Sequence, residues 1–248
     1  MNADSLPAGL LDAARAPYWR CGRFVYEFAG RKLAGDPAYV GILERGLLKG
    51  RQRVLDLGCG LGLLAATLRA AEGCSRRGAW PASWPAAPCA ASIRGIELNA
   101  ATVERARHAL GSSAEIVQGD IRLVEFGAAD AVVILDVLHY IEADAQRGVL
   151  ERVHRALCPT GLLLLRVGDA SAGLRFRISR CWDQAVMLAR GRGLKPLHCR
   201  SVAQWCALLS KCGFESQVVS MSKGMSFANV LLCARPAMPS CGGVGGPA

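Results

Sequence analysis

The chain has 248 residues, of which 52% are hydrophobic, and this size and composition suit a single α/β domain with an elaboration. Its formal net charge of +10 permits an acidic partner or surface. No uncharged apolar run reaches the ~18 residues of a membrane span, and no basic residue precedes Arg15, so neither a span nor a signal peptide is predicted. The 11 cysteines form no Cys-x-x-Cys pair, which favours reduced thiols in a soluble, cytoplasmic protein over a disulfide framework or a zinc site.

Residues 1–49 are predicted to form a helical cap that precedes the sheet. Asp36 followed by Pro37 is typical of a helix start, and the spacing predicts a helix over 37–48. Two interpretations of this cap are open. It packs across the end of the sheet, or it covers a cofactor and substrate that Phe28, Arg31 or Lys32 would touch.

The stretch 54–65 is predicted to be a buried strand, a glycine turn and the first turn of a helix. Its apolar start is typical of a strand in a parallel sheet. Gly58, Gly60 and Gly62 allow positive φ angles and a close approach to the main chain. The unpaired N–H groups of the following helix point toward this turn and favour an anionic or electron-rich ligand.

Two residues indicate which kind of nucleotide site this turn forms. They are Asp56, which precedes the turn, and Leu63, which follows it. A dinucleotide fingerprint requires a third glycine where this chain has Leu63. The pattern Asp56-x-Gly58-x-Gly60-x-Gly62 resembles the nucleotide-binding loop of class I S-adenosylmethionine-dependent methyltransferases. The resemblance implies S-adenosylmethionine as cofactor, and a tight turn without a ligand is the alternative. The loop residues that it implies are Asp56, Gly58, Cys59, Gly60 and Gly62.

A second acid stands at the end of the strand predicted over 93–98. Residues 71–92 carry three prolines and two tryptophans without periodicity, and they are predicted to be an irregular, mobile insertion. Glu97 follows Asp56 by 41 residues, and removing those 22 leaves 19, close to the ~20 usual after such a glycine loop. We therefore expect the Glu97 carboxylate to bind the ribose hydroxyls of the cofactor, and its neighbour Leu98 to be part of the same cofactor site. A solvated acid at a strand end is the alternative.

The next strand is predicted over 115–118 and ends at Gly119-Asp120-Ile121. In the resembling family this strand end reaches the adenine ring. The resemblance implies that Asp120 bonds the exocyclic amine and that Ile121 packs on the ring. A surface turn would use the same residues equally well.

The fourth strand and the start of its loop are predicted over 129–138. Asp136 lies there, outside the carboxyl end of the strand, where open α/β sheets bind ligands. His139 follows, and because an unperturbed imidazole has a pKa of about 6.5, it is the candidate general base. The alternative is that His139 only lines the cofactor pocket.

The remaining pattern completes an alternation of helices and strands. A helix is predicted over 144–157 and a strand over 162–167; the capping-box pair Ser201 and Gln204 opens a helix through 210. Strands over 215–220 and 227–234 close the sheet. This plan resembles the Rossmann-like class I fold, with a seven-stranded, mostly parallel sheet, an antiparallel last strand and helices on both faces. The methyltransferase domain is predicted over 50–235 and a disordered tail over 236–248.

A basic segment, 168–200, interrupts this plan on the substrate side. It is interpreted either as a solvated arginine-rich face or as a docking site for an anionic substrate, such as one tethered to an acyl carrier protein. Its basic residues, which outnumber the two acids Asp169 and Asp183, are Arg175, Arg177, Arg180, Arg190, Arg192, Lys195 and Arg200.

The predicted chemistry is transfer of a sulfonium methyl group to an oxygen, nitrogen or carbon of a small-molecule or carrier-tethered acceptor. The aromatic segment 24–43 is loosely similar to bacterial methyltransferases of polyketide-like and fatty-acid-like pathways. The residues after the fourth strand lack the Asn/Asp-Pro-Pro motif of amino-adenine methyltransferases and the cysteine of the cytosine C5 type, so nucleic acid is not the expected partner. An RNA or protein methyltransferase, a non-catalytic cofactor-binding module and a nicotinamide oxidoreductase are the alternatives.

Overall fold

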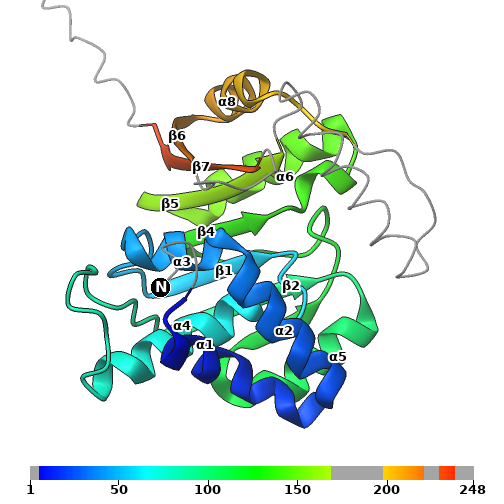
Figure 1. Ribbon diagram of the computed structural model, residues 1–248. Coiled ribbons are helices and arrows are strands. Elements are labelled where there is room, and N and C mark those ends of the chain that lie inside the picture. The colour runs from blue at the N-terminus through cyan, green and yellow to red at the C-terminus, as the bar shows by residue number, and fades with distance from the viewer. Residues whose placement is uncertain (1–5, 169–197, 221–228, 238–248) are drawn as a thin grey trace, which may run out of the picture.

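The computed structural model describes residues 6–168, 198–220 and 229–237 (Figure 1). Within these ranges the chain forms a seven-stranded sheet in the order β3-β2-β1-β4-β5-β7-β6. Strands β1 to β5 run parallel, and β7 is antiparallel to both of its neighbours, β5 and β6. The predicted fold class is therefore confirmed. The strands are β1 (Arg53–Leu57), β2 (Ser92–Glu97), β3 (Glu115–Gln118), β4 (Ala129–Leu135), β5 (Leu157–Gly168), β6 (Phe214–Ser220) and β7 (Asn229–Pro236).

Helices cover both faces of the sheet. One apolar cluster joins α1 to α5 to one face, and a second joins α6 and α8 to the other. Alternate strand residues feed the two clusters, since Val54 lies in the first and Leu55 in the second. The helices are α1 (Ala8–Arg15), α2 (Arg23–Gly35), α3 (Pro37–Glu44), α4 (Leu63–Arg76), α5 (Ala100–Leu110), α6 (Ala143–Ala156) and α8 (Val202–Lys211). Short 3-10 helices are η1 (Ala16–Cys21), η2 (Gly111–Ser113) and η3 (Leu138–Tyr140).

The helix starts that the sequence indicates are made by capping side chains. The Asp36 carboxylate accepts a hydrogen bond from Ala38 N at 3.0 Å and caps α3. Asn99 caps α5 in the same way, by accepting from Thr102 N at 2.9 Å. At α8, Ser201 and Gln204 form both bonds of the predicted capping box.

The N-terminal helices share the main core with the rest of the chain. Leu10, Tyr18, Leu33 and Leu43 are buried in the same apolar cluster as α4 and α5. Figure 1 shows α1 and α2 lying across the side of the sheet that α4 and α5 cover. The segment therefore packs on the helices beside the sheet and reaches its carboxyl edge through α2 and α3.

Some boundaries differ from those expected. Helix α3 ends at Glu44 rather than near 48, because Gly46 and Gly50 adopt φ angles of 60° and 74°. Strand β5 begins at Leu157, five residues early, because its start also pairs with β4 across a register shift.

The segment 71–92 differs as well. Helix α4 continues to Arg76, so the irregular part begins only after it. The Trp80 indole donates to Pro85 O at 2.8 Å and packs edge-on against Trp84 at 5.4 Å between ring centroids. Both indoles are partly buried against the core, which means that this loop is docked on the molecule.

Several expectations fall on residues outside the described ranges. These are the tail from residue 238, the start of the strand expected over 227–234, and most of the basic segment, 169–197. None of the described helices is long and apolar enough to cross a membrane.

Candidate functional site

The glycine turn after β1 has the backbone that its sequence predicts. Gly58, Gly60 and Gly62 have φ angles of 75°, 56° and 74°, which side-chain-bearing residues rarely adopt. Two N–H groups at the start of the turn, those of Gly58 and Cys59, donate to Ile96 O at 2.8 and 3.1 Å. The turn is therefore fixed to the end of β2.

The surroundings of the three glycines differ, as the neighbours of an added Cβ atom show. A Cβ on Gly58 would lie 2.3 Å from Val137 Cγ2, and a Cβ on Gly62 would lie 2.5 Å from Leu110 Cδ1. At Gly60 an added Cβ would meet no atom of the described residues within 4 Å, apart from its own chain neighbours. Packing thus requires glycine at the two outer positions, whereas Gly60 borders open space where a ligand could approach the main chain.

Glu97 lies against this open position. Its Oε2 accepts a hydrogen bond from Gly60 N at 3.2 Å, and its Oε1 accepts from Asn99 N at 2.8 Å. These two bonds fix the carboxylate at the rim of the glycine turn. Each oxygen of a carboxylate has two acceptor positions, so a carboxylate at this place is the type of group that binds a diol such as a ribose.

Asp56 lies beneath the same turn and is 5% exposed. Burial, and secondarily the charge of Glu97, raises the pKa of Asp56 to about 7. Burial also raises the pKa of the Cys59 thiol, so Cys59 is a neutral wall of the turn. A cationic ligand at this position would favour ionisation of Asp56 and offset its repulsion with Glu97.

The end of β3 is tied to the same region, because Gly119 N donates to Glu97 O at 3.0 Å. Asp120 follows, and both of its carboxylate oxygens accept from the Arg122 guanidinium, which lowers the pKa of Asp120. To bond an exocyclic amine, Asp120 would have to exchange Arg122 for the ligand. Ile121 is 7% exposed, and Leu98 is 58% exposed at the end of β2.

The end of β4 carries a network of buried charges that the sequence analysis did not anticipate. Asp136 has a φ of 58°, the one positive φ outside glycine in the described ranges. Arg166, 3% exposed on β5, donates from Nε to Asp136 Oδ1 at 2.9 Å and from a terminal nitrogen to Asp36 Oδ2 at 2.8 Å. Although burial disfavours ionisation, Arg166 and then Lys32 hold the pKa of Asp36 below its ordinary value. An arginine after the apolar run 162–165 is the one sequence signal of this network.

His139 lies beside this network in η3 and is 8% exposed. Its ring packs against Tyr140 at 4.2 Å between centroids, and its carbonyl accepts from His198 N at 2.9 Å. Burial lowers the pKa of His139; Asp136 opposes this shift, and Arg166 adds to it. The imidazole is therefore neutral at neutral pH, which is the form that a general base requires.

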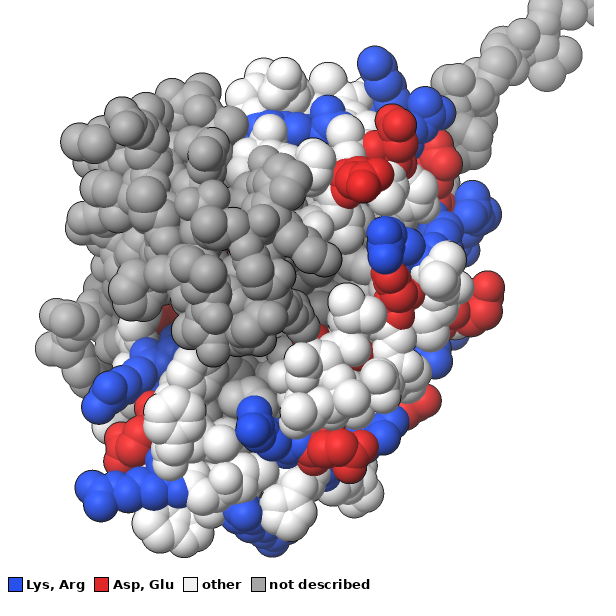
Figure 2. Space-filling view, turned by 90° about the vertical axis from the view of Figure 1, so that its right-hand side faces the viewer, with Lys and Arg blue, Asp and Glu red and all other residues white. Residues whose placement is uncertain are grey.

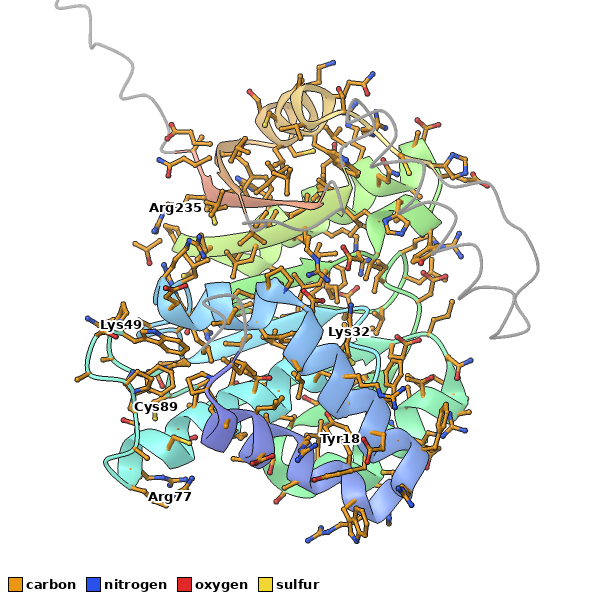
Figure 3. The ribbon with its side chains drawn as sticks, viewed as in Figure 1. Tyr18, Lys32, Lys49, Arg77, Cys89 and Arg235 are labelled. Carbon is orange, nitrogen blue, oxygen red and sulfur yellow. The ribbon has the colours of Figure 1, made fainter. Side chains whose placement is uncertain are left out.

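Tyr18 is a second neighbour of the site that the sequence did not reveal. It is fully buried in η1, and its hydroxyl donates to Leu61 O, within the glycine turn, at 2.9 Å. Figure 3 labels Tyr18, which lies in η1 just before α2, and Lys32, which lies in the last turn of α2. The turn and the β4 loop are thus each reached from the N-terminal helical segment.

Figure 2 shows the face of the molecule at the carboxyl ends of the parallel strands, and the described residues on it carry charges of both signs. Lys and Arg alternate with Asp and Glu over the described residues of this face, without a patch of one sign. Arg200, the described residue at the end of the basic segment, donates to Gln146 Oε1 at 2.7 Å and lies over the Trp205 ring. The described residues visible on this face therefore show no basic stripe of the kind typical of nucleic-acid binding.

Residues 55–163 match the family described as "Methyltransferase domain". Carboxy-S-adenosyl-L-methionine synthase from Chromohalobacter salexigens is 34% identical over 131 residues, which cover 51% of this chain and 43% of that protein. The chain thus spans about half the length of the curated relatives that it matches first.

Solved structures with the same fold cover more of the chain. Human N-acetylserotonin methyltransferase in complex with SAM has a TM-score of 0.60 at 17% identity, covering 94% of this chain and 61% of that one. The DhpI–SAH complex has a TM-score of 0.58 at 19% identity, and the match covers 94% of this chain and 99% of that one. At these identities the likeness concerns the fold.

Proposed function

Because residues 55–163 match a methyltransferase domain, we propose that this chain is a class I S-adenosylmethionine-dependent methyltransferase that transfers the methyl group of this cofactor to a small-molecule acceptor. One observation carries the proposal: Gly60 N and Asn99 N fix the Glu97 carboxylate beside the open face of the glycine turn. A vicinal diol fits such a carboxylate, because two hydroxyls can donate to one charged acceptor. We place the enzyme in the cytoplasm.

Each of the other predicted residues would contact a different part of the cofactor. The turn from Gly58 to Gly62 would approach its methionine part, and Asp56 would offer negative charge below the sulfonium and ammonium groups. The adenine would lie between Leu98 and Ile121, and Asp120 would bond its amine after releasing Arg122. Asp136 would face the side where the acceptor enters. When bound, the cofactor supplies an activated methyl group, so the chain contributes chiefly alignment and exclusion of water.

His139 would remove the proton from a hydroxyl or another weakly acidic acceptor. Its burial keeps it neutral, and its position in η3 after β4 would put it on the side where the acceptor enters. A carrier-tethered acceptor is the finer proposal, and it depends on the basic segment 168–200. The small-molecule proposal does not need that segment.

A second candidate function comes from the curated relatives. Several of them, 28–34% identical to this chain, are named carboxy-S-adenosyl-L-methionine synthases. By analogy, this chain would modify the cofactor itself and release a carboxylated form of it.

Mass spectrometry with methyl-labelled S-adenosylmethionine separates the two. The protein is incubated with the labelled cofactor and pools of candidate metabolites, with heat-denatured protein as control. Methyl transfer predicts an acceptor that gains the label while an equal amount of S-adenosylhomocysteine forms. A heavier, carboxylated cofactor that retains its label would support the second function. Cofactor binding without either product would favour a non-catalytic module.

A further inference from the structure

Two loops border the proposed cofactor site, and each has a buried polar contact with the N-terminal helical segment, residues 6–44. One loop is the glycine turn, which Tyr18 contacts at Leu61. The other is the β4 loop, which Asp36 contacts through Arg166 and Asp136. We propose that this segment positions both loops for the cofactor, so that cofactor affinity depends on Tyr18 and Asp36 although neither is in the predicted binding set. The inference rests on the proposed function.

The Tyr18 contact acts on the part of the turn where the ligand would lie. Leu61 stands between Gly60, which borders open space, and Gly62, which caps α4 in a left-handed conformation. Because Tyr18 is fully buried, its hydroxyl is shielded from competing water. Burial raises the pKa of the phenol well above its ordinary value, so it stays protonated and donates. The bond thus fixes the one carbonyl between these two glycines.

The Asp36 contact acts on the opposite loop. Arg166 divides its donors between Asp36 and Asp136, and both the guanidinium and Asp36 are more than nine-tenths buried. Asp36 also caps α3 and pairs with Lys32 Nζ at 2.8 Å. The end of α2 and the start of α3 therefore determine where Arg166 lies, and Arg166 holds the Asp136 carboxylate. Because the guanidinium of Arg166 is planar and its donors have fixed directions, the position of Asp36 constrains the position of the Asp136 carboxylate.

Two conservative variants test the proposal. Tyr18→Phe removes one hydroxyl without changing the ring, and Asp36→Asn keeps a good helix cap but removes the charge that Arg166 pairs with. The matched control is Tyr26→Phe, which removes a hydroxyl from the same segment, where the ring packs on Trp19 and under Arg15. The readout is the dissociation constant of S-adenosylhomocysteine by calorimetry, well below each variant's melting temperature.

We expect Tyr18→Phe to weaken binding about 2- to 10-fold, the range for one net hydrogen bond, and Asp36→Asn by at least as much. Tyr26→Phe should bind as the wild type does. Because coupling is reciprocal, the ligand should slow amide hydrogen exchange in α1 to α3 of the wild type, and less so in Tyr18→Phe.

Variants that melt earlier but bind with wild-type affinity would overturn the proposal, because a purely structural role predicts that result. A wild-type protein that does not bind S-adenosylhomocysteine would overturn the proposed function, and this inference with it. Wild-type binding with unchanged affinity in both variants overturns the inference alone.

Discussion

Replacing Glu97 by alanine removes the side chain on which the cofactor assignment depends. In the structure its two oxygens accept from Gly60 N and Asn99 N, at 3.2 and 2.8 Å. With the cofactor bound, the same oxygens would also accept from the ribose. Hydrogen bonds to a charged group contribute about 1.5–3 kcal/mol, so the loss of one such interaction should weaken binding roughly 10- to 150-fold. Glu97→Gln, which keeps one acceptor oxygen, should lie between alanine and the wild type.

The assay is calorimetric titration of S-adenosylhomocysteine into each variant, with thermal melting as a check on folding. Glu104→Ala is the matched control, because Glu104 is an exposed acid paired with Arg107 on the surface of α5. It should bind as the wild type does. If Glu97→Ala binds S-adenosylhomocysteine with wild-type affinity, the ribose assignment is refuted, together with the spacing argument that led to it.

Gly60→Val should abolish cofactor binding and lower the melting temperature, because its φ of 56° strains a side-chain-bearing residue although the added side chain meets no neighbour; at Gly58 the same change has a positive φ and also meets Val137, so it should lower the melting temperature further. Calorimetry and thermal melts distinguish these outcomes, and a Gly60→Val protein that binds normally would contradict the assignment. Affinity for S-adenosylmethionine should rise as pH increases through about 7, because Asp56 ionises there beside a cationic ligand. The folded protein keeps a proton that the unfolded Asp56 releases above about 3.8, so stability without cofactor should fall as the pH rises from about 3.8 to about 7. Affinity and melting that do not depend on pH would exclude this role for Asp56. His139→Ala should reduce turnover at saturating acceptor by about 10²- to 10⁴-fold if His139 is the base, and unchanged turnover would exclude it.

Local pattern was sufficient to predict the fold and to select candidate residues that the structure brings together. The alternation of apolar strands and capped helices predicted the sheet, and the caps at Asp36 and Ser201 lie where the sequence indicates them. Glu97 was identified by its place at a strand end and by its spacing from Asp56, and the structure brings it to the glycine turn. These features depend on residues close in sequence, or on a strand order that the resemblance supplies.

Contacts between distant residues could not be read in this way. Arg166 and Asp36 are 130 positions apart, and each is an ordinary charged residue in its local context. Tyr18 contacts Leu61 across 43 positions, so its aromatic character suggested only packing. The pairing of Asp120 with Arg122 is local, yet neither its geometry nor its competition with a ligand follows from composition.

We propose that the glycine turn after β1 binds a nucleoside carrying a charged sulfur. Separate titrations of the wild-type protein with S-adenosylmethionine, S-adenosylhomocysteine and NADH test this binding. We expect saturable binding of the first two at one site per chain and no heat from NADH. Binding of NADH alone, or of none of the three, would contradict it.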